Sequence, residues 1–477
     1  DNSDLLVTTK YANLTLAQLQ ALSPMNTVTI DTGEGTLVLN GYTTINGSEE
    51  GRISYTYTLK DPLTHTQSTN DTTLTDEIPV RVYGGNGDPS HPTTPGSYDP
   101  YGKLVITITD DVPQVGTGPG TTTVTVDETN FVAGQVSTTV NGFGATVIST
   151  IYGADGPATS DALVYSLSLG TVIDSGLKDT ATGRDIWLYM DGYDIVGRVA
   201  AVGNIPSPTG DEAFRISITD AGDVTLTQKR PMDHQTDGSS AAAHDDALSM
   251  LANRVVLNVT VTDKDGDTAT DSKNIGDKFI FKDDGPTIGT GSALSAAIVD
   301  ESALVGGART PTDPDGAGPL PPYGTSATID VSGAFNPNYG TDGAGNVVKT
   351  LVVNGLVPTG LVDTLTGDAV VLTQVSGTVV EGRNSAGDVV FRITLSGNDV
   401  TLQQLRSMDH PLDGATNPDD SISLANGALS LQGVITDGDG DTATHSILIG
   451  DRFQFLDDAP TIGTGSALSA AIVDESA

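Results

Sequence analysis

Residues Val255–Ser272 read VVLNVTVTDKDGDTATDS, and this stretch indicates the fold most directly. Its first half, Val255–Thr262, alternates apolar and polar residues, which is the period-two pattern of a half-buried β-strand. A cluster of Asp and Gly follows, which is typical of a turn, and a further polar segment comes after it. The stretch therefore predicts two antiparallel strands joined by an acidic turn.

The same alternation recurs along the chain, with Gly, Asp and Asn between the segments. Helical signal is scarce, and its best candidate is the short stretch Leu14–Leu22. Closely spaced strands of this kind predict an all-β protein built from tandem antiparallel β-sandwiches of the immunoglobulin type. The other segments with the strand pattern are Gly51–Leu59, Lys103–Thr109, Ala162–Leu169, Ala213–Thr219, Lys278–Phe281 and Val389–Leu395.

Internal repetition divides the chain. Residues 460–477 are identical to residues 286–303, and residues 113–128 are a looser copy of them. An acidic pair precedes the proline of each copy, and these pairs lie 173 and then 174 residues apart. The period predicts a slice of a longer array, with a β-sandwich module at 1–112, full repeats at 113–285 and 286–459, and the start of a further repeat at 460–477. Because each repeat exceeds the ~100 residues of a minimal immunoglobulin-like sandwich, we expect extra strands or an insertion, the latter near Pro311–Tyr323.

Composition excludes several classes of protein. The 477 residues include 61 Asp and Glu against 22 Lys and Arg, a formal net charge of −39, which argues against nucleic acid or an anionic membrane surface as a partner. There is no cysteine, so disulfides, thiolate metal sites and a cysteine nucleophile are excluded. The chain starts at Asp1 without a leader-like segment, which is expected of a mature or excised chain.

The sharpest chemical signal is the motif D-x-D-G-D, which occurs twice, in Asp263–Asp267 and in Asp437–Asp441. Three carboxylates at alternating positions, with a glycine bending the backbone, can converge on one hard cation, and Ca²⁺ accepts six to eight such oxygens. It is not an EF-hand, because Thr268 and Thr442 stand where that loop needs glycine. Asp-Gly also suits a simple hairpin turn, but two copies at the repeat period, together with other acidic elements at that period, favour a calcium site.

Topology predicts which acidic elements meet. A turn between the last two strands of a sandwich lies at the end where the chain enters the domain, next to the acidic pair that ends the preceding module. We therefore expect Asp110 and Asp111 to share calcium with the first motif, and Asp283 and Asp284 with the second. The sequence leaves open whether Glu128 and Glu301, which follow a first strand, bind metal at the same junction, at the opposite one, or not at all. The predicted ligands are Asp110, Asp111, Glu128, Asp263, Asp265, Asp267, Asp283, Asp284, Glu301, Asp437, Asp439, Asp441, Asp457 and Asp458.

The order D-x-D-G-D-T-A, strand, D-D-x-P and V-D-E resembles the repeats of giant type I-secreted RTX adhesins of Gram-negative bacteria. It is also similar to cadherin-like linkers, in which acidic residues before a proline pair with acidic turns of the next domain. The resemblance implies a calcium-rigidified stalk at the bacterial cell surface, exported unfolded and folded in external calcium, with the adhesion ligand bound by another region. The 1–112 module shares GTLVLNGY and the closing LVITITDDVP with related repeats of such adhesins. It lacks D-x-D-G-D, and only Gly84–Asp88 lies near the equivalent place. The glycine-rich nonapeptide array of RTX proteins is absent, so a calcium β-roll is not implied.

The sequence does not predict an enzyme. It contains neither G-x-S-x-G nor H-E-x-x-H, and His234 and His410, each within Met-Asp-His, are expected to be structural histidines. The alternative to a non-catalytic extender is a ligand-binding adhesin module for a glycan or a surface ligand. That alternative requires a concave polar or aromatic pocket in residues 1–112 or around Trp187, Tyr189 and Tyr193, although such an aromatic cluster is more often core.

Overall fold

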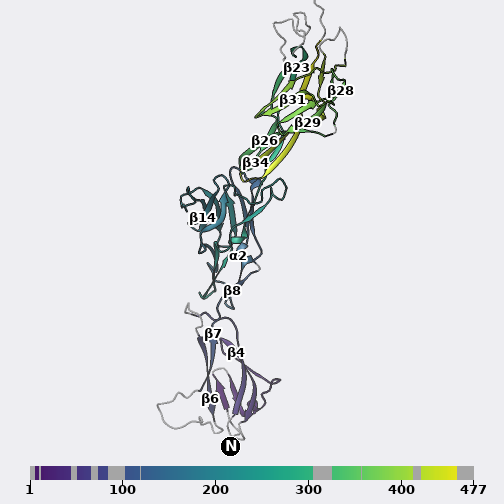
Figure 1. Cartoon of the computed structure of the whole chain (residues 1–477). Helices are drawn as coiled ribbons and strands as arrows, with labels where there is room; N and C mark the ends of the chain where they lie inside the picture. The colour runs from purple at the N-terminus through teal and green to yellow at the C-terminus, as the bar shows by residue number, and fades with distance from the viewer. Residues whose placement is uncertain are drawn as a thin grey trace, which may run out of the picture.

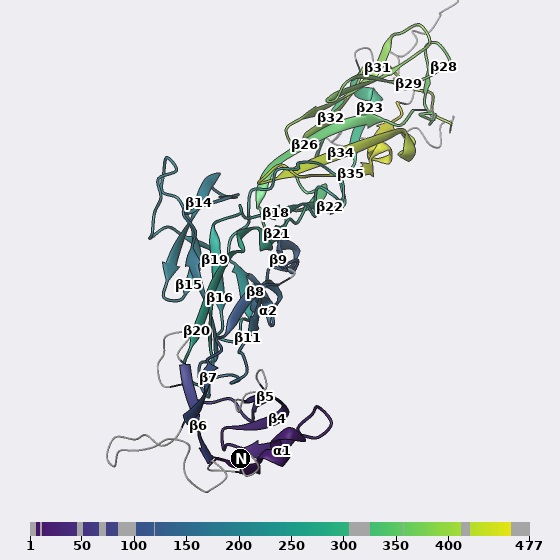
Figure 2. The ribbon, with the colours of Figure 1, turned by 90° about the horizontal axis from the view of Figure 1, so that it is seen from below.

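The computed structural model describes residues 6–9, 12–44, 51–65, 73–83, 102–118, 120–304, 325–355, 357–411 and 420–458, the side chains of 6–9, 81–83 and 117 excepted. Three all-β modules follow one another end to end in chain order (Figure 1, Figure 2). Each has its own hydrophobic core, whose residues come from within one predicted module. The boundaries themselves stay predictions, and residues 84–88, 311–323 and 460–477, on which the sequence made predictions, lie outside the described residues.

The first module packs two antiparallel sheets, in the orders β2-β1-β6-β7 and β3-β4-β5, around a core that includes Leu19, Ile30, Leu37 and Ile78. Its helix α1 begins after Thr15, which forms a capping box with Gln18. The elements are β1 Leu6–Thr9, β2 Asn13–Thr15, α1 Leu16–Gln20, β3 Val28–Asp31, β4 Gly35–Thr44, β5 Gly51–Leu59, β6 Thr73–Tyr83 and β7 Gly102–Thr109.

The middle module contains a six-stranded sheet, in the order β10-β17-β16-β15-β14-β13, and smaller sheets that include β12-β19-β20 and β18-β21-β9. Phe214 and Phe281 pack in its core with ring centroids 5.3 Å apart. The elements are β8 Gln114–Thr117, β9 Val124–Asp127, η2 Glu128–Asn130, β10 Val136–Val140, α2 Phe143–Val147, β11 Ile148–Ile151, β12 Leu163–Leu169, β13 Asp174–Asp179, β14 Arg184–Asp191, β15 Asp194–Val199, β16 Glu212–Ile218, β17 Val224–Gln228, β18 Ala247–Ser249, β19 Val255–Thr262, β20 Thr268–Asn274, η3 Gly276–Lys278 and β21 Phe279–Lys282.

The third module repeats this plan with a five-stranded sheet, β24-β32-β31-β30-β29, and the sheets β26-β34-β35 and β23-β36-β33. Phe391 and Phe455 take the places of the core pair, again with ring centroids 5.3 Å apart. The elements are β22 Thr287–Thr290, β23 Ala297–Asp300, η4 Glu301–Ala303, β24 Ser326–Asp330, β25 Phe335–Asn338, β26 Ala344–Val353, β27 Val362–Asp363, β28 Asp368–Ala369, β29 Val371–Ser376, β30 Val379–Arg383, β31 Val389–Ser396, β32 Asp399–Gln404, β33 Ser421–Ser423, η5 Asn426–Ala428, β34 Leu429–Asp437, β35 Thr442–Leu448, η6 Gly450–Arg452 and β36 Phe453–Leu456.

In each repeat, one short strand near its start runs parallel to the last strand. β9 pairs with β21 in the register Asp127 to Lys282, and β23 pairs with β36 in the register Asp300 to Leu456. Parallel strands end at the same edge of a sheet. The residues after each pair, Glu128 with Asp283 and Glu301 with Asp457, are therefore brought to the same end of their module.

The predicted fold class is confirmed: the described residues form mainly antiparallel sheets packed in tandem modules, and the extra strands expected in each repeat are present. One topological prediction was wrong, namely that the D-x-D-G-D turn joins the last two strands of each repeat. The D-x-D-G-D turn joins β19 to β20 and β34 to β35, but a further strand, β21 or β36, follows in each repeat. In the described part of the chain, no helix is long and apolar enough to span a membrane.

The tight core of the third module gives a first testable prediction. Ile393 is fully buried, so Ile393→Val removes one buried methylene and is expected to lower the free energy of unfolding by about 0.5–1.5 kcal/mol. Differential scanning calorimetry should show one of the unfolding transitions shifted. Val371→Ala is the control, because Val371 is 63% exposed and is expected to change stability by less than about 0.5 kcal/mol. An equal shift in both variants would contradict the packing argument.

Candidate metal centres at the module junctions

Each D-x-D-G-D turn holds its first carboxylate by one oxygen only. Oδ1 of Asp263 accepts hydrogen bonds from the backbone N–H groups of Gly266 (3.1 Å) and Asp267 (2.8 Å). Oδ1 of Asp437 accepts the corresponding bonds from Gly440 (3.1 Å) and Asp441 (2.7 Å). The second oxygen of each carboxylate, Oδ2, is buried without a hydrogen-bond partner among the described residues.

The middle carboxylate of each turn is held by the preceding module. Oδ2 of Asp265 accepts a hydrogen bond from the backbone N–H of His65 at 3.0 Å, and Oδ2 of Asp439 accepts one from that of His234 at 3.3 Å. Again the other oxygen, Oδ1, is buried and has no hydrogen-bond partner in the described parts of the chain. The two turns therefore lie at the junctions, at the end where the chain enters each repeat.

The acidic pair that precedes each repeat is held by a loop of that repeat. Asp284 accepts hydrogen bonds from the backbone N–H (3.2 Å) and the hydroxyl (2.7 Å) of Thr341, and Asp111 accepts one from the N–H of Ala154. Both donors lie in the same motif, Y-G-x-D-G, at residues 152–156 and 339–343. The loop thus anchors the second carboxylate of the pair and also carries an aspartate of its own, Asp155 or Asp342.

The glycine of this loop is required by its geometry. Gly340 has a φ of +68° and Gly153 a φ of +83°, in the left-handed region that side chains disfavour. In addition, a Cβ at Gly340 would overlap the carboxylate of Asp284, and one at Gly153 would overlap that of Asp111. Only glycine allows the loop backbone to lie directly on the acidic pair.

Glu128 belongs to the second junction rather than the first. Its Oε1 accepts hydrogen bonds from the backbone N–H of Met232 (2.9 Å) and from Gln228, and its Oε2 accepts one from the hydroxyl of Thr341 (3.1 Å). The parallel pairing of β9 with β21 places it there, beside Asp283. The structure places Glu128 at the end of its module opposite to the one the chain enters by.

The carboxylates converge into compact groups whose potential ligand atoms lie within 4.8 Å of one another. At the second junction Asp342 belongs to two such groups, so it joins the pre-proline pair to the acidic turn. The first junction has one comparable group, in which Asp155 takes the corresponding place. The groups are Glu128, Asp283, Asp284 and Asp342; Asp342, Asp437 and Asp439; and Asp110, Asp155 and Asp265.

This concentration of negative charge is unfavourable in the absence of a cation. Burial, followed by the charges of Glu128, Asp439 and Asp283, raises the pKa of Asp342 to about 10. Burial likewise raises the pKa of Glu128 to about 8, and burial together with the neighbouring Asp439 raises that of Asp437 to about 7. Ionised carboxylates at this density require a counter-charge, which a bound divalent cation supplies.

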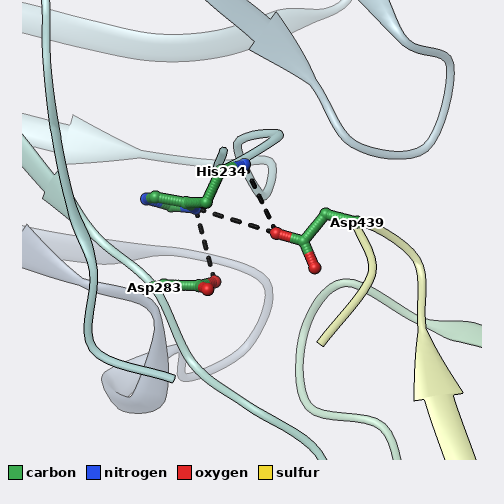
Figure 3. Close-up of side chains that lie close together, drawn as sticks. All are labelled: His234, Asp283 and Asp439. Carbon is green, nitrogen blue, oxygen red and sulfur yellow. Dashed lines mark hydrogen bonds and ion pairs between the residues drawn. The ribbon is translucent and has the colours of Figure 1, made fainter. Parts of the chain in front are cut away.

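His234 supplies part of that counter-charge (Figure 3). Its Nδ1 lies 3.3 Å from Oδ1 of Asp283 and 4.0 Å from Oδ2 of Asp439. Its ring nitrogens also lie 3.0 Å and 3.3 Å from the carbonyl oxygens of Met232 and Phe281. Burial alone would lower the pKa of His234, but the hydrogen bond and charge of Asp283, with the charge of Glu128, raise it to about 9. The expected structural histidine is thus part of the junction.

The far end of the third module carries a similar arrangement. Glu301, His410 and Asp457 form a group with potential ligand atoms within 4.8 Å. Glu301 accepts hydrogen bonds from Gln404 (2.8 Å) and from the N–H of Met408 (2.7 Å), which matches Glu128 in the preceding module. Asp458 donates its backbone N–H to Asp457 at 2.9 Å. The group borders a cavity of about 760 Å³ lined by residues that include Leu365, Arg406 and Asp458.

The donor set fits calcium better than a softer metal. Each turn presents carboxylate oxygens that are oriented by backbone N–H groups and have a second oxygen left over, and Ca²⁺ prefers such oxygen ligands in flexible geometry. Burying an unpaired carboxylate oxygen is unfavourable, so several in one place point to a ligand rather than to a simple turn. The oxygens of this kind in the predicted ligands are Oδ2 of Asp263, Asp267, Asp283, Asp437 and Asp441 and Oδ1 of Asp265 and Asp439.

The structure brings together most of the predicted ligands and adds others. Asp110 meets Asp265, Asp283 meets Asp439, and Glu301 meets Asp457. Five predicted ligands belong to none of the groups of three or more in the described chain: Asp111, Asp263, Asp267, Asp441 and Asp458. The sequence missed Asp155, Asp342 and His65, whose Nδ1 lies 3.5 Å from Oδ2 of Asp110. The recurrence of Y-G-x-D-G was a usable signal for the first two.

The aromatic cluster of Trp187, Tyr189 and Tyr193 does not lie where the sequence predicted. Trp187 and Tyr189 are half-buried on β14 rather than in the core, and Trp187 pairs across the sheet with Arg198. Tyr193 is 88% exposed in the turn between β14 and β15. The expectation that this cluster belongs to the core was therefore wrong.

Comparisons with known proteins concern the repeats and the fold. A family model described as "Domain of unknown function (DUF5801)" matches residues 123–276 and 296–450. No curated protein matches the chain. Among solved structures, the chain is similar to protocadherin gamma B2 extracellular cadherin domains 3–6 at 13% identity and a TM-score of 0.16, covering 88% of this chain and 65% of that one. Protocadherin gamma B7 cadherin domains 1–4 match at 10% identity and a TM-score of 0.16, with 93% and 91% covered. The chain thus spans about two thirds of the length of the first of these structures.

Proposed function

The chain belongs to the DUF5801 family of domains, and from that premise we propose that it is a non-catalytic, calcium-stabilised extender segment of a large bacterial surface adhesin. In this role the repeats form a stalk that projects a ligand-binding region away from the cell. The partners of the segment are neighbouring repeats of the same chain and Ca²⁺, and the adhesion ligand is bound by another region of the full protein. Its place is outside the cell, where calcium is available.

One observation carries the proposal: carboxylates from two consecutive modules converge at each described junction with buried oxygens left unpaired. At the second junction, Asp283 comes from the middle module, whereas Asp342 and Asp439 come from the third. A cation bound there contacts both modules at once, so its binding free energy opposes their separation. Sites of this kind in extracellular modules typically have dissociation constants of about 10⁻⁴–10⁻³ M, which suits external calcium.

The proposal is tested by thermal unfolding and small-angle scattering of the whole chain, in excess chelator, in millimolar calcium and in millimolar magnesium. A site filled at 100 times its dissociation constant adds about 2.7 kcal/mol of stability. We therefore expect a rise in melting temperature with calcium and a stiffer, extended scattering profile, because the cation neutralises the junctions. Magnesium is the control, since its strict octahedral geometry suits these flexible oxygen sets poorly.

Identical melting and identical scattering in chelator and in calcium would contradict the calcium role. The acidic motifs would then be turns without a ligand, and the adhesin-module alternative would be tested next by screening the chain on a glycan array. A rise in melting temperature of the same size with magnesium would leave a cation site but contradict its assignment to calcium.

A further inference from the structure

A segment of the middle module reaches over the second junction without any need for metal. Residues 233–246, between β17 and β18, are here named the clasp. Gly238 donates its N–H to Oδ1 of Asp441 at 2.8 Å, and its carbonyl oxygen accepts the N–H of Thr442 at 2.7 Å. The clasp thus makes a two-way contact with the end of the D-x-D-G-D turn and with the first residue of β35.

A side chain of the clasp extends this contact. Nε2 of His244 lies 3.2 Å from the carbonyl oxygen of Thr442 and 3.8 Å from Oδ2 of Asp441. The imidazole also covers Gly285, where a Cβ would overlap the ring. His244 is therefore packed between the linker that joins the two modules and the strand that follows the acidic turn.

The beginning of the clasp recurs at the first junction. His234 donates its backbone N–H to the middle aspartate of the second turn, Asp439, and His65 donates its N–H to the middle aspartate of the first turn, Asp265. In both cases the donor belongs to the module before the turn. A histidine whose backbone N–H binds the middle aspartate of the next D-x-D-G-D turn is therefore common to the two described junctions.

These bonds join backbone groups and one imidazole to the acidic turn, and none of them requires a cation. The two backbone bonds to carboxylates use oxygens other than the unpaired ones, because they hold Oδ1 of Asp441 and Oδ2 of Asp439. Oδ2 of Asp441, which lies 3.8 Å from Nε2 of His244, and Oδ1 of Asp439 are not hydrogen-bonded within the described residues.

We propose that the clasp is a cation-independent interaction surface whose partner is the D-x-D-G-D turn of the following repeat. It keeps the second junction docked when no cation is bound, and cation binding then tightens two modules that are already in contact. Only the tightening rests on the proposed function; the docking does not.

The test uses distance measurements by electron spin resonance on the whole chain. Because the chain has no cysteine, cysteines at Val202 and Val371 provide two unique label sites, 77% and 63% exposed, one in each module. The labelled chain with an unchanged clasp is the parent. In chelator, it is expected to keep one population of label-to-label distances, centred at the distance found in calcium. The variant Gly238→Pro/His244→Ala, which removes the N–H donor and the ring but no carboxylate, is expected to lose that population in chelator and to regain it in calcium.

His244→Ala alone is a milder variant, and Ser239→Ala, an exposed change within the clasp, is the matched control. A second readout is hydrogen exchange at the amide of Thr442, which should be protected in chelator in the parent and in the control, and exposed in the double variant. A parent that already loses its single population in chelator, or a double variant that keeps both the population and the protection, would overturn the clasp. If calcium changes neither parent nor variant while the two differ in chelator, the clasp stands and the calcium role fails.

Discussion

Replacing Asp342 by Asn is expected to remove most of the calcium-dependent stabilisation of the second junction and to reverse the order of stability in chelator. Asp342 is the residue shared by the two carboxylate groups at that junction, so both lose a ligand. Each site contributes about 2.7 kcal/mol at 100 times its dissociation constant, so weakening both is expected to lower the stability in calcium by about 3–5 kcal/mol.

The reversal in chelator follows from the electrostatics of the metal-free junction. Burial, with the charges of Glu128, Asp439 and Asp283, raises the pKa of Asp342 to about 10, which means that its ionised form is strongly disfavoured there. An amide has no such charge, and both carboxylate oxygens of Asp342 are buried without a hydrogen-bond partner in the part of the chain described. Asp342→Asn is therefore expected to be at least as stable as the parent in chelator but less stable in calcium.

Calorimetry of the parent and of Asp342→Asn, in chelator and in calcium, measures whether the order of their melting temperatures reverses. Asp399→Asn is the matched control, because Asp399 is exposed on β32 of the same module and its loss removes the same formal charge. Asp155→Asn gives the corresponding change at the first junction, where one group of three is affected. Equal calcium shifts in the parent and in Asp342→Asn would contradict the assignment of Asp342 to the metal.

The strands were predictable because a strand with one buried and one exposed face alternates apolar and polar residues along its sequence. Val255–Thr262 and Gly51–Leu59 alternate clearly, and the observed strands β19 and β5 have the predicted bounds. The short strand β21 lies within one residue of the predicted segment Lys278–Phe281, and β9 is the first strand that Glu128 was expected to follow. Their parallel pairing, however, is far from local in sequence, so the position of Glu128 could not be predicted.

The acidic turns were predictable for a related reason. D-x-D-G-D is a local motif whose three carboxylates are fixed by a hairpin turn, and the repeat period shows where it recurs. Asp155 and Asp342 are different, because Y-G-x-D-G recurs 187 residues apart rather than at the 173 or 174 of the acidic pairs. A search at the fixed period passes over this loop. Part of the contribution of His65 and His234 comes from their backbone N–H groups, which no residue type reveals.

Replacing Arg406 by Ala is expected to destabilise the third module by about 3–5 kcal/mol at neutral pH. Nη2 of Arg406 lies 3.0 Å from Oδ2 of Asp363, and its Nε lies 3.3 Å from Oδ1, which is a bidentate pair. The side chain of Asp363 is fully buried. Removing the guanidinium therefore leaves a buried carboxylate with only Asn384 and Thr366 as side-chain donors.

The loss of stability in Arg406→Ala relative to the parent is expected to become smaller as the pH is lowered. In the parent, burial would raise the pKa of Asp363, but the hydrogen bonds from Asn384, Arg406 and Thr366 outweigh it and lower the pKa. Such a group stabilises the fold above its unfolded pKa of about 3.9, and the contribution is lost as the pH falls through the folded value. Without Arg406 the carboxylate is disfavoured while ionised and relieved by protonation, so the gap between variant and parent narrows as the pH is lowered from 7 towards 4.

Urea unfolding of parent and variant in calcium at several pH values measures both effects. Arg406→Ala combined with Asp363→Asn is the control, because removing both charges leaves no buried ion, and it should be more stable than Arg406→Ala alone. The middle module contains the same pair, Arg230 with Asp179 at 3.0 Å, so Arg230→Ala should reproduce the loss in the other repeat. A deficit that stays constant from pH 7 to pH 4 would show that lost packing of the arginine, and not the orphaned carboxylate, causes the destabilisation.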